Sequence, residues 1–203
     1  MRVGLFGGFF NPPHIGHIQA ARSAAEKLEL QRVLFIPSCV PPHKDVPPGT
    51  PSPEIRMRMA GIAASEVPGG EVCDVEIKRG GVSYTCDTVE QLRRELPGDD
   101  MWLIVGSDML LSIQDWENAR EIFKTCAIAA LARNTADFGN IYAHADVLKS
   151  RFGARIDIIP HEPVEISSSE LRRRLREGDG SYVTAGVYKY IAENRLYEFM
   201  EAK

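Results

Sequence analysis

The sequence lacks any long hydrophobic run. No apolar stretch approaches the ~20 residues that a helix needs to cross a bilayer. The N-terminus also lacks the order of a signal peptide, in which a basic segment precedes an apolar stretch and a small-residue cleavage site. We therefore expect a soluble, cytoplasmic protein with no membrane partner.

Cysteine is scarce, and neither sign of charge dominates. The four cysteines, Cys39, Cys73, Cys86 and Cys126, form no CxxC pair, so zinc-finger and thioredoxin-type sites have little support. Lys and Arg number 24 against 28 Asp and Glu, a net charge of -4. That balance argues against binding of nucleic acid through bulk charge, but it permits a local phosphate site.

The length and the apolar content favour a single globular domain over residues 1–203, because the chain has 203 residues, 44% of them hydrophobic. Residues 2–8 and 32–37 are short apolar runs, and the stretch between them repeats apolar residues at helical spacing. A strand, a helix and a strand within 37 residues are typical of a right-handed βαβ unit with parallel strands.

The same alternation continues along the chain and predicts a Rossmann-like, doubly wound α/β fold. Its sheet would be mainly parallel, with helices on both faces and a helical C-terminal end. Ligands in such folds bind beyond the carboxyl ends of the strands. The predicted further strands are 72–77, 101–105, 126–131 and 156–159, the predicted helices are 53–65, 88–96 and 141–152, and 168–196 forms two helices broken near 178–180.

The turn after the first predicted strand carries two histidines. Gly7 and Gly8 end the strand, and His14 and His17 lie three positions apart where a helix begins. Amides at a helix N-terminus and two imidazoles suit a phosphate group. The alternative is an ordinary strand-to-helix turn in which the histidines cap or pack. Neither GxGxxG nor GxxxxGK[ST] is present, which disfavours a dehydrogenase or a P-loop enzyme.

A second candidate anion site lies near the C-terminus. Ser167 and Glu170 have the spacing of a capping box, which predicts the start of a helix. Ser169 and Arg172 could bring a hydroxyl and a guanidinium to that helix end. The alternative is a capped surface helix with solvated arginines.

Both segments resemble the signatures of the nucleotidylyltransferase superfamily. The first is a glycine pair, Phe-Asn-Pro and His-x-Gly-His, and the second is Ile-Ser-x-Ser-x-x-Arg. The resemblance implies that His14 and His17 contact ATP and stabilise its α-phosphorus as the transfer occurs. It also implies ATP contacts near Gly7, Gly8 and Phe9, with the β- and γ-phosphates on Ser167, Ser169 and Arg172. Phe9 departs from the family pattern, which usually has Thr or Ser there.

Segments in the middle of the chain resemble the bacterial nicotinate-mononucleotide adenylyltransferases. They are Val40-Pro-Pro-His-Lys44, Ser83-Tyr84-Thr85, Gly106-Ser-Asp108 and Trp116. The resemblance implies an ATP contact at Gly106 and substrate contacts at Lys44, Tyr84, Thr85, Asp108 and Trp116. Trp116 could stack on the pyridine ring, Tyr84 and Thr85 could bind its carboxylate, and Asp108 could bind ribose. Each also has a structural alternative, such as core packing for Trp116.

The resemblance implies transfer of the adenylyl group of ATP to nicotinate mononucleotide, giving nicotinate adenine dinucleotide and pyrophosphate in NAD biosynthesis. His14, His17, Lys44 and Arg172 would be catalytic. Mg²⁺ would accompany ATP without a metal site made by the protein.

Alternatives remain within and outside this activity. They are a nicotinamide mononucleotide or phosphopantetheine adenylyltransferase, a cytidylyltransferase, and a non-catalytic nucleotide sensor. His14 counts against the phosphopantetheine enzyme, and Phe9 keeps the sensor open. A homo-oligomer is compatible with the sequence, which does not determine the oligomeric state.

Overall fold

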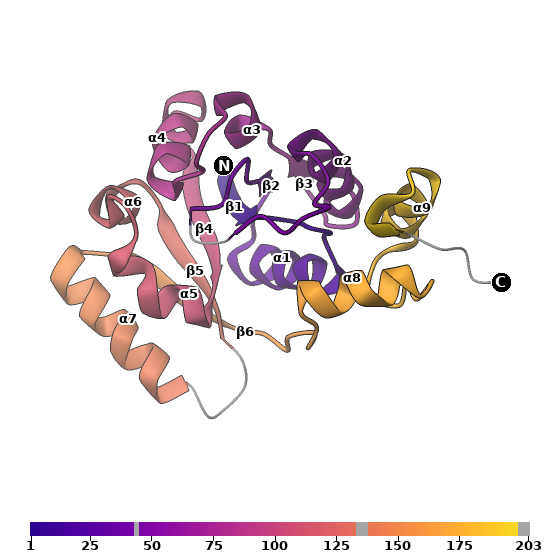
Figure 1. Cartoon of the computed structure of the whole chain (residues 1–203). Helices are drawn as coiled ribbons and strands as arrows, with labels where there is room; N and C mark the ends of the chain where they lie inside the picture. The colour runs from indigo at the N-terminus through magenta and orange to yellow at the C-terminus, as the bar shows by residue number, and fades with distance from the viewer. Residues whose placement is uncertain (43–44, 133–137, 199–203) are drawn as a thin grey trace.

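The computed structural model describes residues 1–42, 45–132 and 138–198. Its centre is a parallel sheet of six strands in the order β3-β2-β1-β4-β5-β6, which confirms the predicted fold class (Figure 1). The strands are β1 (Arg2–Gly8), β2 (Arg32–Pro37), β3 (Gly70–Val72), β4 (Asp100–Gly106), β5 (Ala127–Ala132) and β6 (Ile156–Pro160).

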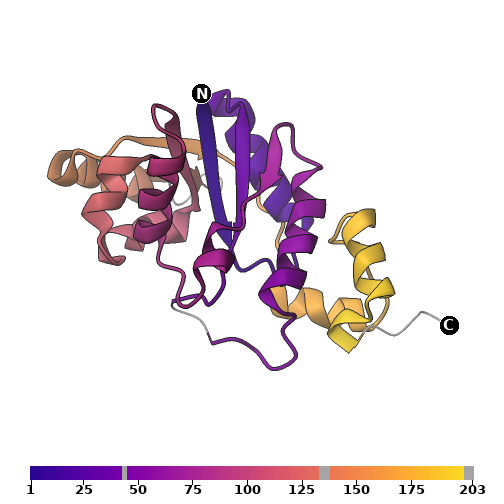
Figure 2. The same ribbon diagram turned by 90° about the horizontal axis from the view of Figure 1, so that it is seen from above.

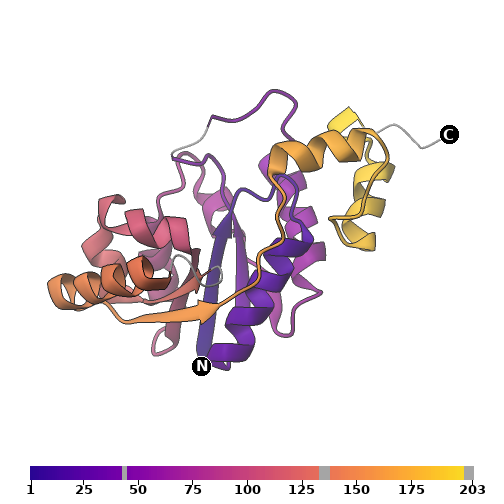
Figure 3. The same cartoon turned by 90° about the horizontal axis from the view of Figure 1, so that it is seen from below.

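Helices cover both faces of the sheet (Figures 2 and 3). One face packs against α1 (Ile15–Leu28) and α2 (Pro53–Ala64), and its apolar cluster continues into α8 (Ser168–Arg176) and α9 (Ala185–Glu193), of which α9 packs against α2. The other packs against α3 (Val75–Arg79), α4 (Thr85–Glu95), α5 (Ser107–Ser112), α6 (Ala119–Thr125) and α7 (Phe138–Phe152). The described residues also contain two short 3-10 helices, η1 (Ile113–Asp115) and η2 (Leu196–Glu198). Among the described residues, no helix has the length and apolar character to cross a membrane.

The central strands β2, β4 and β5 are buried over nearly their whole length, as their apolar runs predict. The predicted helix 53–65 is α2, and the helical tail is α8 and α9 with a break at residues 177–184. The helices α5 and α6, between β4 and β5, were not predicted.

The predicted strand over 72–77 is wrong. Only Gly70–Val72 pairs with β2, and the chain then forms the helix α3. Tertiary contacts explain the difference, because helical geometry buries Val75 in the core and lets the buried carboxylate of Glu76 accept a hydrogen bond from Thr88 at 2.7 Å. At this sheet edge those contacts outweigh the strand propensity of the segment.

The strand order reverses at β1. The chain goes from β1 outward to β2 and β3, and then returns to place β4 on the other side of β1. In doubly wound sheets this switch point opens a crevice at the carboxyl ends of the strands. The segment after β1 carries His14 and His17, and the segment after β4 carries Asp108. Both segments therefore lie at that edge of the sheet.

Candidate active site

The turn after β1 holds Phe10 in a strained backbone conformation. Its φ angle is 45°, a region that bulky residues rarely adopt. Packing holds it there, because the Phe10 ring is 2% exposed and lies 5.7 Å from the ring of Phe35, between centroids. Gly8 leaves the necessary space, since a Cβ atom on it would lie 2.9 Å from the Phe10 ring.

The two histidines of the motif lie against each other. His14 is the N-cap of α1, and the centroids of the His14 and His17 rings are 3.7 Å apart. The His17 Nδ1 atom accepts a hydrogen bond of 3.0 Å from the His14 backbone N–H, which places the proton of neutral His17 on Nε2. Gly16 leaves room for the His14 ring, because a Cβ atom on Gly16 would lie 3.0 Å from atoms of that ring.

His14 is electrically neutral in this environment. Burial lowers its pKa to about 4, because desolvation disfavours the charged imidazolium. Its Nδ1 atom is buried and has no hydrogen-bond partner among the residues that the structure describes. An unsatisfied buried polar atom beside a helix N-terminus is an observation that favours a ligand at this point.

The C-terminal motif reaches the same turn. Ser167 caps α8 by accepting a hydrogen bond of 3.1 Å from the Glu170 N–H, as the capping-box spacing predicts. Arg172 then donates from Nη2 to Ser169 Oγ at 3.3 Å and from Nη1 to the main-chain oxygen of Asn11 at 3.0 Å. The structure therefore brings Ser167, Ser169 and Arg172 to the turn that carries His14 and His17.

The second half of the capping box is not formed. The Glu170 carboxylate instead accepts hydrogen bonds from Arg173 at 2.7 Å and from Arg174 at 2.9 Å. The alternative of surface arginines thus holds for Arg173 and Arg174, which form ion pairs with Glu170, whereas Arg172 points to the histidine motif.

Asn11 joins three segments of the chain. Its side chain donates to Thr50 Oγ1 at 3.1 Å and accepts from the Tyr197 hydroxyl at 2.8 Å, while its main-chain oxygen accepts from Arg172. Asn11 is 3% exposed, and burial raises the pKa of Tyr197. The motif after β1, the loop between β2 and α2 that carries Thr50, and the C-terminal segment are held together at this residue.

Arg56 joins the turn after β1 to the segment after β2. It is 1% exposed and donates to the main-chain oxygens of Phe9 at 2.8 Å and of Cys39 at 3.1 Å. The Cys39 N–H in turn donates to Ser83 Oγ at 2.9 Å. Tyr84 follows as the exposed N-cap of α4.

The remaining predicted site residues lie at the same edge of the sheet or outside the described part. Thr85 opens α4, and Gly106 ends β4 as the N-cap of α5, with Asp108 exposed in the first turn. Trp116 is half-buried and packs against the core on the α4–α7 face, so its core-packing alternative holds in part. Lys44 lies outside the described residues.

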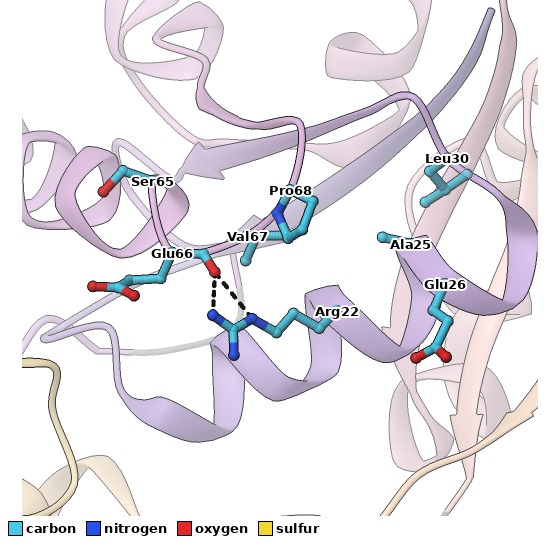
Figure 4. A pocket seen from close by; sticks show the side chains of 8 residues that line it. All are labelled: Arg22, Ala25, Glu26, Leu30, Ser65, Glu66, Val67 and Pro68. Carbon is cyan, nitrogen blue, oxygen red and sulfur yellow. Dashed lines mark hydrogen bonds between the residues drawn. The ribbon is translucent and has the colours of Figure 1, made fainter.

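One cavity among the described residues lies away from this edge of the sheet. It has a volume of about 600 Å³ and lies between the C-terminal ends of α1 and α2, where Arg22 donates to the main-chain oxygen of Glu66 (Figure 4). A smaller cavity of about 270 Å³ adjoins Asn11, because Thr50, Arg172 and Tyr197 line it. The smaller cavity therefore shares Arg172 with the candidate active site.

Known proteins match almost the whole chain. The cytidylyltransferase-like family matches residues 5–174, which include both motifs. The chain belongs to this family. A relative from Carboxydothermus hydrogenoformans is 37% identical over 97% of this chain and 98% of its own, and one from Geobacter metallireducens is 36% identical over the same shares. Both are named as a probable nicotinate-nucleotide adenylyltransferase.

Solved structures share the fold of this cytidylyltransferase-like chain. The nicotinic acid mononucleotide adenylyltransferase of Plasmodium falciparum complexed with NaAD matches with a TM-score of 0.75. The match covers 98% of each chain at 17% sequence identity. It confirms the Rossmann-like arrangement of sheet and helices.

In this cytidylyltransferase-like chain, sequence reasoning assigned no role to Arg56, Asn11 or Tyr197. A signal for Arg56 was present, because it recurs at helical spacing with the buried Met59 and Ala63 on the apolar face of α2. A charged residue at an apolar position indicates a buried contact. Asn11 belongs to the first motif, but no local pattern indicates its contact with Tyr197, which spans 186 positions.

Proposed function

We propose that the chain transfers the adenylyl group of ATP to nicotinate mononucleotide, giving nicotinate adenine dinucleotide and pyrophosphate in NAD biosynthesis. The observation that carries the proposal is the contact of Arg172 with Asn11, because it unites the two phosphate motifs at the switch point of the sheet. The names of relatives that are 32–37% identical over nearly the whole chain support the same activity. Both substrates are cytoplasmic metabolites, so we also propose the cytoplasm as its location.

In the proposed reaction an oxygen of the 5′-phosphate of nicotinate mononucleotide attacks the α-phosphorus of ATP. The new P–O bond forms as the bond from the α-phosphorus to the α,β-bridging oxygen breaks, and pyrophosphate leaves with that oxygen. His17 would donate from Nε2 to the α-phosphate, and His14 would hydrogen-bond with it through a neutral ring. Catalysis would come from positioning and from stabilisation of developing negative charge.

The leaving pyrophosphate would be held at the N-terminus of α8. Ser167 accepts the Glu170 N–H, so its own hydroxyl proton remains to be donated to a phosphate oxygen. Ser169 and Arg172 would complete the site with a second hydroxyl and a charged, planar donor. The glycines Gly7 and Gly8, with Phe9 and Gly106, would let the nucleotide approach the strand ends.

Mg²⁺ is part of the proposal as the ion that accompanies ATP and offsets its charge. Among the residues that the structure describes, no three His, Cys, Asp or Glu side chains form a metal-binding group. An ion held chiefly by phosphate oxygens and water, as is usual for Mg²⁺ with nucleotides, needs no such group of side chains.

We propose that the edge from α4 to η1 recognises nicotinate mononucleotide. Tyr84 and Thr85 begin α4, where backbone amides and a hydroxyl suit the pyridine carboxylate. Asp108 would accept hydrogen bonds from ribose, and Trp116 would offer its ring as a stacking surface. Lys44 would contact a phosphate group from the loop after β2.

The experiment is an assay of the full chain with ATP, Mg²⁺ and one acceptor at a time. We expect equimolar pyrophosphate and nicotinate adenine dinucleotide with nicotinate mononucleotide, and loss of both on addition of EDTA until Mg²⁺ is restored. Faster pyrophosphate release with the nicotinamide analogue or with phosphopantetheine would show that this acceptor, and not nicotinate mononucleotide, is the substrate. ATP binding without pyrophosphate release from any acceptor would favour the sensor.

A further inference from the structure

Arg56 is a fully buried arginine on an otherwise apolar helix face. It is 1% exposed and lies one turn from Met59 and Ala60, which are also buried. Its Nε atom has no hydrogen-bond partner among the described residues. The acidic residue next to it on α2, Glu54, is exposed to solvent. Burial of a charge is unfavourable unless other groups compensate it, so a specific role is expected for this arginine.

Arg56 contacts the turn after β1, which carries the first phosphate motif, and the segment after β2. Its two Nη atoms bind the oxygens of Phe9 and Cys39, and its guanidinium carbon lies 4.3 Å from the centre of the Phe9 ring. Because a trans peptide is planar, an oxygen that faces Arg56 directs the N–H of the next residue to the opposite side. Arg56 thereby sets the direction of the Phe10 N–H.

Two arginines hold the strained residue from either side. Arg56 binds the oxygen of Phe9 and Arg172 binds that of Asn11, and between them Phe10 has a φ angle of 45°. Strained residues persist where their surroundings over-determine them, and such residues cluster at functional sites. The Phe10 ring contacts His17, with 5.1 Å between ring centroids. If the loss of Arg56 displaces Phe10, the His17 imidazole is displaced with it.

Among the described residues, no carboxylate forms an ion pair with Arg56. Burial lowers its pKa from the ordinary value, yet an arginine remains protonated at neutral pH. A polyphosphate bound at the N-terminus of α1 would bring negative charge to the turn that Arg56 supports. In a low dielectric such an attraction is stronger than in water.

We propose that Arg56 is a positioning residue for ATP, which holds the Phe9–Phe10 peptide and His17 in place and has the bound polyphosphate as its counter-charge. It would act on the ATP side of the reaction while touching neither substrate. The expected changes in kcat/KM rest on the proposed function. The expected change in tripolyphosphate affinity requires only that this site binds a polyphosphate.

The test compares Arg56→Met with Arg58→Met, an exposed arginine on the same helix. For Arg56→Met we expect kcat/KM for ATP to fall about 10- to 100-fold, a range typical of a misplaced catalytic group. The KM of Arg56→Met for nicotinate mononucleotide should stay within about 3-fold of the wild-type value. For Arg58→Met, kcat/KM should stay within about 2-fold of wild type for both substrates. Calorimetry with tripolyphosphate should show weaker binding to Arg56→Met only.

Arg56→Lys separates charge from geometry. One ammonium group keeps the charge but lacks the planar fork that binds two carbonyls. We expect its kcat/KM for ATP to lie between wild type and Arg56→Met. Should Arg56→Met fail to melt cooperatively, the test passes to Arg56→Lys, for which a loss of about 3-fold or more supports the proposal and wild-type values overturn it.

Other outcomes are also decisive. Tripolyphosphate affinity and ATP kinetics of Arg56→Met equal to those of Arg58→Met overturn the proposal. Equal increases in the KM for ATP and the KM for nicotinate mononucleotide also overturn it, since they indicate a purely structural role. If the wild-type chain releases no pyrophosphate, the proposed function fails, and tripolyphosphate binding alone then decides the role of Arg56.

Discussion

Arg172 donates from Nη1 to the main-chain oxygen of Asn11 across 3.0 Å, although 161 positions separate the two residues in the chain. The bond places the C-terminal serine–arginine motif against the turn that carries the two histidines. In the free protein the guanidinium is thus already directed to the end of β1. Such pre-positioning reduces the conformational entropy that the arginine side chain loses when a ligand binds.

Arg172→Ala should raise the KM for ATP. Loss of a hydrogen-bond donor to a charged group costs about 1.5–3 kcal/mol, or about 10- to 100-fold. The matched control is Arg173→Ala on the same helix, because Arg173 is paired with Glu170 and Glu177 at the surface. Steady-state kinetics with varied ATP measure both variants, and equal KM values would remove Arg172 from the ATP site.

His17→Ala should lower kcat more than it raises KM. The loss of one donor that stabilises developing charge reduces turnover by about 10²- to 10³-fold in comparable sites. His144→Ala on α7 is the control, since that imidazole bonds to Gln114. Single-turnover measurements of nicotinate adenine dinucleotide formation separate chemistry from product release. Wild-type turnover in His17→Ala would contradict the assigned role.

His14 should make stability depend on pH in the acidic range. Its pKa is about 4 in the folded chain against 6.5 for the ordinary group, so the unfolded chain binds this proton at higher pH. The contribution to the free energy of unfolding is complete above pH 6.5 and falls as the pH drops towards 4, by up to about 3 kcal/mol.

Urea denaturation of wild type and His14→Gln between pH 4 and 7.5 measures this contribution. The difference between the two proteins should change only below about pH 6.5, because other titrating groups are common to both. A constant difference over that range would show that the His14 imidazole is not buried in its neutral form.

Tyr197→Phe should destabilise the fold. It leaves the buried Oδ1 atom of Asn11 without the hydroxyl that donates to it, which costs about 1–3 kcal/mol. Tyr190→Phe on α9 is the control, because this change keeps the half-buried ring packed against the core and should alter stability by about 0.5 kcal/mol or less. Thermal and urea unfolding measure both variants. Equal stability would mean that the contact between Tyr197 and Asn11 contributes little.

The fold was predictable because its strands are buried on both faces. Runs such as 101–105 and 126–131 are apolar throughout, and helical periodicity separates them, so the α/β order follows from local patterns. The edge strand β3 gave a weaker pattern. There the apolar residues of 72–77 fit a strand as well as a helix, and the contact of Glu76 with Thr88 decided between them.

The candidate site was predictable where function requires adjacent residues. His14 and His17, or Ser169 and Arg172, must share one turn of helix, so each motif is continuous in the sequence. Arg56 and Asn11 act through contacts between distant segments, and no local pattern encodes those contacts. Arg56 nevertheless has a sequence signal, a charge on the apolar face of α2, which can be looked for in other chains.

A crystal structure of the full chain with Mg²⁺ and a non-hydrolysable ATP analogue tests the central claim most directly. The account predicts one triphosphate that reaches from His14 and His17 to Ser169 and Arg172, with its α-phosphate at the imidazoles. A triphosphate that contacts one motif and leaves the other unoccupied, or that lies in the cavity between α1 and α2, would contradict it.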